Sequence, residues 1–253
     1  TEITEYIQKN ETAIERNIHR VWSANEKTAL ETALGMSYAG KRSLSCMKHV
    51  GLNVAADVFI NAAITGINGG LVVAVADDPS QHSSQNEQDS RFYGKFAMIP
   101  FFEPSNQQEA YDITYNAFEL SEKTGLPVMI RIPTRLAHSR SGVIRKPLLK
   151  EQEIRLPENL MQFMLVPAFG RKYYQNLLDK QDWLLELSEG SEFNSYSEGE
   201  DKSLGIVCCG IAYNYLMENF PEGKCPYPLV KLTHYPVPAK LLRKLENECK
   251  ELL

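Results

Sequence analysis

The sequence predicts an α/β fold in which a mainly parallel sheet is followed by a second, smaller α/β unit. Strand-like and helix-like patterns alternate from residue 21 to residue 133, which is typical of βαβ units. The segment GGLVVAVADD (69–78) is apolar without alternation, as expected for a strand that is covered on both faces. The 253 residues, 43% of them hydrophobic, provide enough apolar material for one large domain or two modest ones.

Three helices are predicted between the strands of the first half of the chain. Residues 26–40 have apolar side chains at helical spacing and end at a glycine. Residues 52–66 are apolar nearly all round, so this helix is expected to lie between other elements. A helix over 107–125 is expected to begin at a capping box formed by Ser105 and Gln108. The predicted strands are 19–25, 42–47, 69–78, 96–105 and 127–132.

The second half of the chain begins after a linker. Residues 80–91 contain no aliphatic side chain and are predicted to form a surface or site-lining loop, the polar loop. Residues 140–160 have no periodic pattern and are rich in charge and proline, which is typical of a linker. The elements expected beyond it are a helix near 170–188, a polar hinge at 188–202, strands at 204–210 and 227–232, and helices at 211–220 and 239–253.

Composition excludes several classes of protein. The formal net charge is −5 and no segment carries a basic stripe, which argues against a nucleic-acid-binding protein. The apolar runs are too short to cross a bilayer, so no membrane span is expected. The five cysteines form no CxxC pair and no iron–sulfur ligand set. They fit a chain that works in the reducing cytoplasm.

Candidate site residues follow the predicted strands, because ligands of open α/β sheets bind at the carboxyl ends of the strands. The residues in these positions are Asn25-Glu26, Lys48-His49, Asp77-Asp78 and Thr134-Arg135 with His138, and His82 is a further candidate in the loop after Asp78. Four of these residues also have a structural explanation. Glu26 can compensate the helix dipole in a first turn, Lys48 and His49 can end a solvated strand, and His82 can contact solvent in the polar loop. Asn53 and Asp57 are interpreted as helix groups rather than as site residues.

Three stretches of the sequence resemble a known family. They are residues 22–57, which include MKHVGLN, residues 76–112, which include HSSQNEQDSR, and residues 117–140. These stretches are similar to the α subunits of the indolepyruvate:ferredoxin oxidoreductases, which are thiamine-diphosphate-dependent 2-oxoacid:ferredoxin oxidoreductases. The strings GIAYNYLMENF and THYPVPAKLLRKL after residue 160 are similar to the second domain of this family, though less distinctively.

The resemblance implies a domain organisation and a reaction. Residues 1–145 are expected to form a pyrimidine-binding domain that lacks its first strand, 146–160 a linker, and 161–253 an incomplete domain like the carboxyl-terminal domain of transketolase. The resemblance implies that the Glu26 carboxyl group shares a proton with N1′ of the aminopyrimidine of thiamine diphosphate. Lys48, His49, His82, Arg135 and His138 are candidates to meet the substrate carboxylate or to steady the polar loop.

The expected reaction is oxidative decarboxylation of an aryl 2-oxoacid such as indolepyruvate to an acyl-CoA, with ferredoxin as the electron acceptor. The chain has no Gly-Asp-Gly run for Mg²⁺ and the cofactor's diphosphate, and no cysteine-rich tail for iron–sulfur clusters. We therefore expect a chain that is truncated at both ends or split, inactive alone, and active with a β subunit in a homo-oligomeric assembly. Two alternatives stay open: a non-catalytic interaction subunit, and a component of a non-oxidative thiamine-dependent 2-oxoacid decarboxylase.

Overall fold

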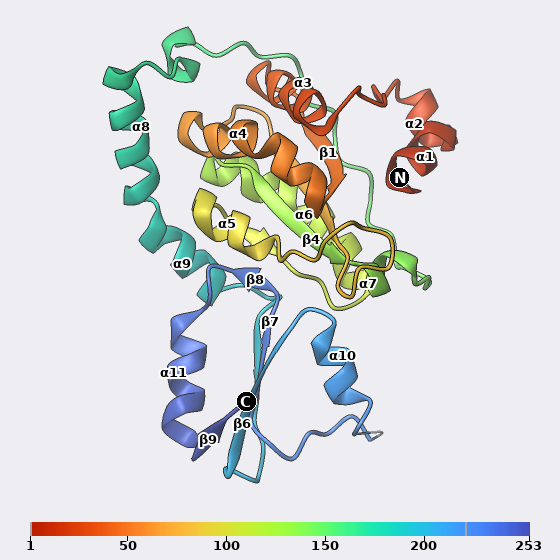
Figure 1. The fold of residues 1–253 in the computed structure, drawn as a ribbon, viewed down its shortest axis with the longest axis vertical. Coiled ribbons are helices and arrows are strands. Elements are labelled where there is room, and N and C mark those ends of the chain that lie inside the picture. Colours follow the sequence, from red (N-terminus) through yellow and green to blue (C-terminus); the bar gives the residue numbers. More distant parts are fainter. Residues whose placement is uncertain (1, 221) are drawn as a thin grey trace.

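Residues 2–220 and 222–253 are described by the computed structural model, and their strands form two sheets that follow one another along the long axis of the molecule (Figure 1). The first sheet has the strand order β1-β2-β4-β3-β8, in which β8 is antiparallel to β3 and the other neighbours are parallel. Its strands are β1 (Ser43–Lys48), β2 (Leu71–Asp77), β3 (Phe101–Phe102), β4 (Val128–Pro133) and β8 (His234–Tyr235). The predicted α/β fold with a mainly parallel sheet is confirmed.

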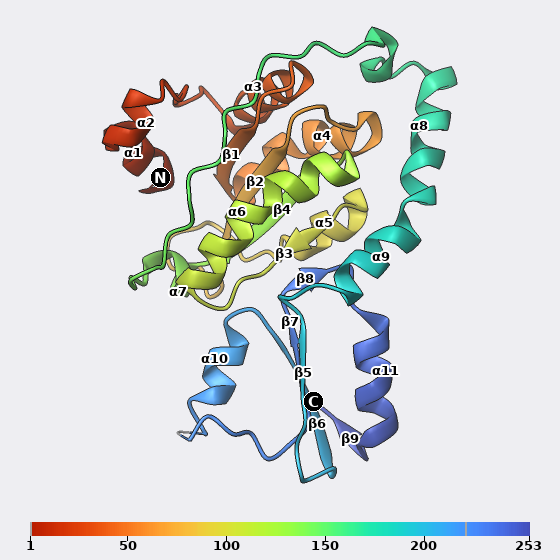
Figure 2. The ribbon, with the colours of Figure 1, turned by 180° about the vertical axis from the view of Figure 1, so that it is seen from behind.

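Helices cover both faces of the first sheet. The helices α3 (Glu26–Tyr38), α4 (His49–Thr65) and α5 (Arg91–Ala97) lie on one face, and α6 (Gln107–Thr124) lies on the other (Figure 1, Figure 2). Residues of β2 are buried apart from Ala76, which is partly buried, as expected for a strand covered on both sides. The helix α4 packs against α3 and the sheet, which explains why it is apolar nearly all round.

The second unit, residues 167–253, begins with two helices that run down one side of the molecule (Figure 2). They lead to a sheet of order β5-β7-β6-β9, in which β6 is parallel to β7 and β9, and β5 is antiparallel to β7. The elements of this unit besides β8 are α8 (Pro167–Asp179), α9 (Gln181–Glu189), β5 (Ser195–Ser197), β6 (Leu204–Cys209), α10 (Ala212–Met217), β7 (Leu229–Leu232), α11 (Ala239–Glu248) and β9 (Glu251–Leu252).

The strand β8 joins the second unit to the first sheet. Tyr235 pairs with Phe101 of β3, and the two rings are stacked with their centroids 4.3 Å apart. The second unit is therefore packed directly against the edge of the first sheet. The domain limits 1–145, 146–160 and 161–253 stay a prediction.

Several predicted elements of the first half are wrong. Residues 19–25 form no strand, because Val21 and Trp22 are exposed and find no sheet edge. The predicted strand 96–105 is divided between the end of α5 and the two-residue β3. The capping box of α6 is displaced by one residue: Asn106 caps the helix, and the Glu109 carboxylate accepts hydrogen bonds from the backbone N–H and hydroxyl of Ser105.

The second half also differs from its predicted elements. The helix expected at 170–188 is two helices, α8 and α9, and the polar hinge contains β5. The last helix ends at Glu248 and is followed by β9 rather than continuing to residue 253. The other helices are α1 (Glu2–Lys9), α2 (Glu11–Glu15), α7 (Thr134–His138) and a 3-10 turn at Leu160–Phe163. None of the helices in the described part of the chain combines the length and the apolarity needed to cross a membrane.

Candidate functional site

The carboxyl ends of β1, β2 and β4 lie side by side at one edge of the first sheet. Lys48 of β1 is in register with Ala76 of β2, and Asp77 of β2 is in register with Pro133 of β4. The first residues of α4 and α7 and the segment after β2 therefore meet at this edge. The polar loop, predicted at 80–91, is the segment 78–90 that joins β2 to α5 in the structure, and the name is kept for this segment.

Glu26 begins α3 and lies against the first turn of α4. Asn25 caps α3 by accepting a hydrogen bond from the backbone N–H of Thr28 at 2.9 Å, which fixes where the helix starts. The Glu26 side chain is so close to Gly51 that a Cβ on that glycine would lie 2.5 Å from Cγ and 2.7 Å from Oε1. Only a glycine leaves this space. The half-buried Glu26 carboxylate makes no hydrogen bond or ion pair to another residue in the described part of the chain.

His49 and Lys48 both hold the polar loop. The buried His49 ring places Nε2 3.0 Å from the carbonyl oxygen of Asn86 and Nδ1 3.4 Å from that of Ala76. The Lys48 ammonium donates to the carbonyl and hydroxyl oxygens of Ser83 at 2.6 and 2.9 Å. Two roles are expected for Lys48 and His49: to bind the substrate carboxylate or to steady the polar loop. The contacts in the structure are of the second kind. Their role at a substrate carboxylate stays a prediction.

Asp78 fixes the first turn of the polar loop. Its carboxylate accepts the backbone N–H of Ser83 at 2.7 Å and that of His82 at 3.2 Å, together with the Thr134 hydroxyl at 2.8 Å. These hydrogen bonds, that from the Ser83 N–H above all, hold the pKa of the Asp78 carboxyl well below its usual range. The ionised carboxylate thus ties the loop to the beginning of α7.

Replacing Asp78 by Asn is expected to destabilise the chain in a pH-dependent way. A depressed folded-state pKa stabilises the fold at any pH above the ordinary aspartate pKa of about 4, and this contribution is lost only as the pH falls through the folded-state value. Urea unfolding should therefore show a constant deficit for Asp78→Asn between about pH 8 and pH 5, which closes below about pH 4. The matched control is Asp57→Asn, at an exposed aspartate paired with Lys27. An equal deficit in the two variants would contradict the expectation.

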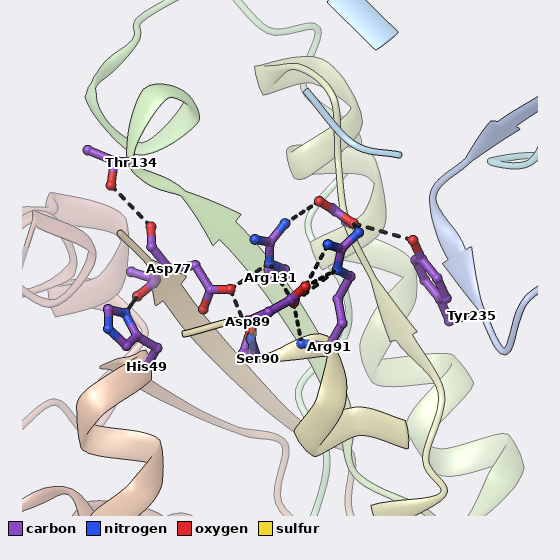
Figure 3. A network of polar contacts seen from close by, with 10 residues as sticks. His49, Asp77, Asp89, Ser90, Arg91, Arg131, Thr134 and Tyr235 are labelled. Atoms are coloured by element: carbon purple, nitrogen blue, oxygen red, sulfur yellow. Dashed lines mark hydrogen bonds and ion pairs between the residues drawn. The ribbon is translucent and has the colours of Figure 1, made fainter. Parts of the chain in front are cut away.

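A network of charged side chains, centred on the buried Asp77, Glu103 and Arg131, joins the end of the polar loop to the first sheet (Figure 3). Arg131 of β4 donates from Nε to Asp77 Oδ2 at 2.6 Å and from its terminal nitrogen to Glu103. Asp77 Oδ2 also accepts the backbone N–H of Ser90 at 3.0 Å. Ser90, the last residue of the loop, is thereby bonded to the end of β2, and Asp77 links it to Arg131 of β4.

Arg91, the first residue of α5, extends this network. Its guanidinium makes two-pronged contacts with Asp89 at 2.6 to 2.9 Å and reaches Glu103 Oε2 at 3.4 Å. Burial by itself would lower the pKa of Arg131, but Glu103, Asp77 and Asp89 outweigh that effect and raise it. Burial and the nearby Glu103 charge likewise raise the pKa of Tyr235, so its hydroxyl stays protonated and donates to Glu103 Oε2 at 3.4 Å.

The sequence interpretation placed Asp77 at the end of a strand but did not find the rest of this network. The sequence contained two signals of this network: a lone arginine in the apolar strand VMIRIP and an aspartate at the end of β2. They point to an ion pair, because a buried charge needs a partner of opposite sign. The sequence could not show that Glu103, after the short β3, is that partner.

The three other candidates are exposed at the same edge. His82 lies in the polar loop and uses its backbone N–H to bond Asp78. Arg135 and His138 lie on α7, where the Arg135 guanidinium is 5.9 Å from the ring centroid of Tyr215 on α10. The structure therefore brings Glu26, Lys48 and His49 together around the first turn of α4 and leaves His82, Arg135 and His138 exposed at the same edge. In the described residues, no group of three or more His, Cys, Asp or Glu side chains could hold a metal ion.

Comparisons with known proteins identify the family of this chain. Residues 1–177 match the family model described as pyruvate flavodoxin/ferredoxin oxidoreductase, thiamine diphosphate-binding. Indolepyruvate oxidoreductase subunit IorA of Archaeoglobus fulgidus is 43% identical over 239 residues, which are 92% of this chain and 38% of that protein. The protein of the same name from Pyrococcus horikoshii is 43% identical over 246 residues, 93% of this chain and 38% of that protein. The chain thus spans less than two fifths of the length of these relatives.

Solved structures share the fold. A 2-oxoglutarate:ferredoxin oxidoreductase from Magnetococcus marinus aligns with a TM-score of 0.73 at 15% identity, covering 100% of this chain and 52% of that one. A split-gene transketolase in an inactive tetrameric form aligns with a TM-score of 0.58 at 14% identity, covering 98% and 68%. The resemblance seen in the sequence is confirmed. The chain belongs to the pyruvate flavodoxin/ferredoxin oxidoreductase family, through the thiamine diphosphate-binding domain that its first 177 residues match.

Proposed function

We propose that this chain supplies the pyrimidine half of the thiamine diphosphate site in an enzyme that oxidatively decarboxylates aryl 2-oxoacids. The observation that carries the proposal is the Glu26 carboxylate, which is half-buried against Gly51 and has no hydrogen-bond partner in the described residues. A carboxyl group in this setting can hold a proton against a ring nitrogen of a bound ligand. Glu26 therefore fits the aminopyrimidine N1′ of the cofactor.

The chain's own residues have distinct tasks in this proposal. When bound, thiamine diphosphate supplies a thiazolium that accepts the electrons released on decarboxylation. The Glu26 Oε atoms hold and return a proton at N1′. His49 and Lys48 fix the polar loop beside the first turn of α4, where it can exclude water from the ligand. The exposed His82, Arg135 and His138 are proposed to meet the substrate carboxylate or the loop.

Other components complete the proposed enzyme. Mg²⁺ and the cofactor's diphosphate would be bound by a segment with a Gly-Asp-Gly run, which this sequence does not contain. Iron–sulfur clusters elsewhere in the assembly would carry electrons to ferredoxin, and CoA would accept the acyl group. The relatives are named as subunits, which supports a partner β subunit in a larger oligomer. The five cysteines are all unpaired in the described residues, which supports a cytoplasmic location.

The substrate and acceptor are tested in the complete assembly. Purified complex with thiamine diphosphate, Mg²⁺ and CoA is expected to reduce ferredoxin with indolepyruvate, and more slowly with pyruvate. Release of CO₂ without ferredoxin reduction would favour the non-oxidative decarboxylase instead. Absence of any heat of thiamine diphosphate binding in calorimetry would favour the non-catalytic interaction subunit.

Replacing Gly51 by Ala tests the space around Glu26. The new methyl group would collide with Glu26 Cγ and Oε1, so the flexible Glu26 side chain must turn away while α4 gains helix propensity of up to about 1 kcal/mol. We expect turnover to fall by at least about tenfold without loss of thermal stability. The control is Gly35→Ala in α3, where a Cβ meets nothing within 4 Å and activity should be unchanged. Equal activity of the two variants would contradict the placement of Glu26.

A further inference from the structure

Glu103 is held from two sides by different parts of the molecule. On the first-sheet side, its carboxylate accepts hydrogen bonds from Arg131 and Arg91. On the other side lies the second unit: the Glu103 N–H donates to the carbonyl of Thr233 at 2.8 Å, and the Tyr235 hydroxyl donates to Oε2 at 3.4 Å. Glu103 therefore lies at the contact between the two units.

The second unit also limits where the Glu103 side chain can lie. A Cβ added to Gly210, which follows β6, would be 2.5 Å from Glu103 Cγ and 2.8 Å from Oε1. The glycine backbone thus lies directly against the carboxylate. A small displacement of the second unit must move the Glu103 side chain or break its contacts.

The partners of Glu103 lead to the polar loop. Arg131 bonds Asp77, which accepts the Ser90 N–H, and Arg91 bonds Asp89. Of the last two loop residues, Asp89 is therefore bonded directly to Arg91, and Ser90 is linked to Arg131 through Asp77. Asp77, Glu103 and Arg131 are buried, whereas Asp89 and Arg91 are partly exposed. Moving the Glu103 carboxylate therefore leaves the buried Arg131 cation without part of its counter-charge, so these groups hold one another in place.

We propose that Glu103 is a positioning residue that couples the placement of the second unit to the conformation of the polar loop. A partner or ligand that shifts the second unit changes how tightly the loop is held, and the reverse follows from thermodynamic linkage. The carrier of the coupling is the chain of contacts from Gly210 and Tyr235 through Glu103 and the two arginines to the end of the loop. The inference rests on this network and does not depend on the identity of the cofactor.

The decisive experiment compares two glycine variants of the full chain by hydrogen–deuterium exchange. Gly210→Ala pushes a methyl group into Glu103, whereas Gly223→Ala imposes a similar positive-φ strain, +71° against +50°, with nothing within 4 Å of the new Cβ. We expect amides of residues 83–90 to exchange at least about tenfold faster in Gly210→Ala than in Gly223→Ala. Equal exchange of these amides in the two variants would overturn the coupling, whatever happens within the second unit.

Milder substitutions keep the test decisive if Gly210→Ala does not fold. Glu103→Gln removes the charge and keeps the shape, and its control is Glu122→Gln, at a carboxylate with a two-pronged pair to Arg42 away from the loop. We expect the amides of residues 83–90 to exchange faster in Glu103→Gln but not in Glu122→Gln. In Tyr235→Phe we expect the exchange of the same amides to increase by a smaller factor. Unchanged loop exchange in Glu103→Gln and Tyr235→Phe overturns the proposal. These readouts need no cofactor, so a failure of the proposed function would not affect them.

Discussion

Replacing Glu26 by Gln is expected to lower the turnover of the complete assembly by about 10²- to 10⁴-fold while the chain stays folded. Gln has nearly the same shape as Glu but cannot take up and return a proton at the cofactor's N1′. Because the Glu26 carboxylate has no ion pair or hydrogen bond to lose in the described residues, the substitution should barely change the thermal midpoint. The measurement is 2-oxoacid-dependent ferredoxin reduction together with thermal unfolding of each variant.

The matched control for this prediction is Glu31→Gln. Glu31 lies on the same helix, is exposed, and forms a loose pair with Lys27 at 3.9 Å, so its loss should change neither activity nor stability appreciably. Near-normal turnover of Glu26→Gln would refute the catalytic assignment and favour the helix-dipole explanation of this residue. A folded but inactive Glu31→Gln would show that any charge on α3 matters, which would also refute it.

The fold was predictable where burial is continuous. The helices α3 and α4 and the strands β1, β2 and β4 follow from apolar spacing, because their packing on a large sheet dominates over local detail. The wrongly predicted strands contain apolar residues that stay exposed in the structure. Val21, Trp22 and Phe96 look like parts of buried strands in the sequence, yet all three side chains are more than half exposed.

The candidate site was predictable only in part. The rule that ligands bind at the carboxyl ends of strands led to Glu26, Lys48 and His49, which the structure places around one helix turn. The role of Gly51 depends on the approach of α3 to α4, and that of Glu103 on a sheet neighbour more than 130 residues away, Tyr235. Such contacts join parts of the chain that no local pattern connects.

Replacing Arg131 by Met is expected to be the most destabilising single change in the chain, at about 3 to 5 kcal/mol, because it leaves buried carboxylates without their counter-charge. Arg131 is 8% exposed and contacts Asp77 and Glu103, which are 1% and 3% exposed. The measurement is urea unfolding at neutral pH. The control is Arg42→Met. The Arg42–Glu122 pair is half-buried and more exposed to solvent, so it should contribute about 1 kcal/mol or less to the free energy of unfolding.

The pH dependence and a double variant separate lost charge balance from lost packing. Burial by itself would raise the pKa of Asp89, but the hydrogen bond from Arg91 and the charge of Arg131 hold it below its usual value. The part of the stability that Arg131 contributes in this way is present above the ordinary aspartate pKa of about 4, so the deficit of Arg131→Met should shrink as the pH falls below about 4. Adding Glu103→Gln restores the original net charge of the cluster and should recover part of the stability that Arg131→Met loses. A cavity or packing defect would respond to neither change, because an apolar void does not titrate and gains nothing from a neutral amide beside it. If the stability loss of Arg131→Met does not change with pH, and if the losses of the two single substitutions simply add up in the double variant, Arg131 acts by filling space rather than by neutralising carboxylates.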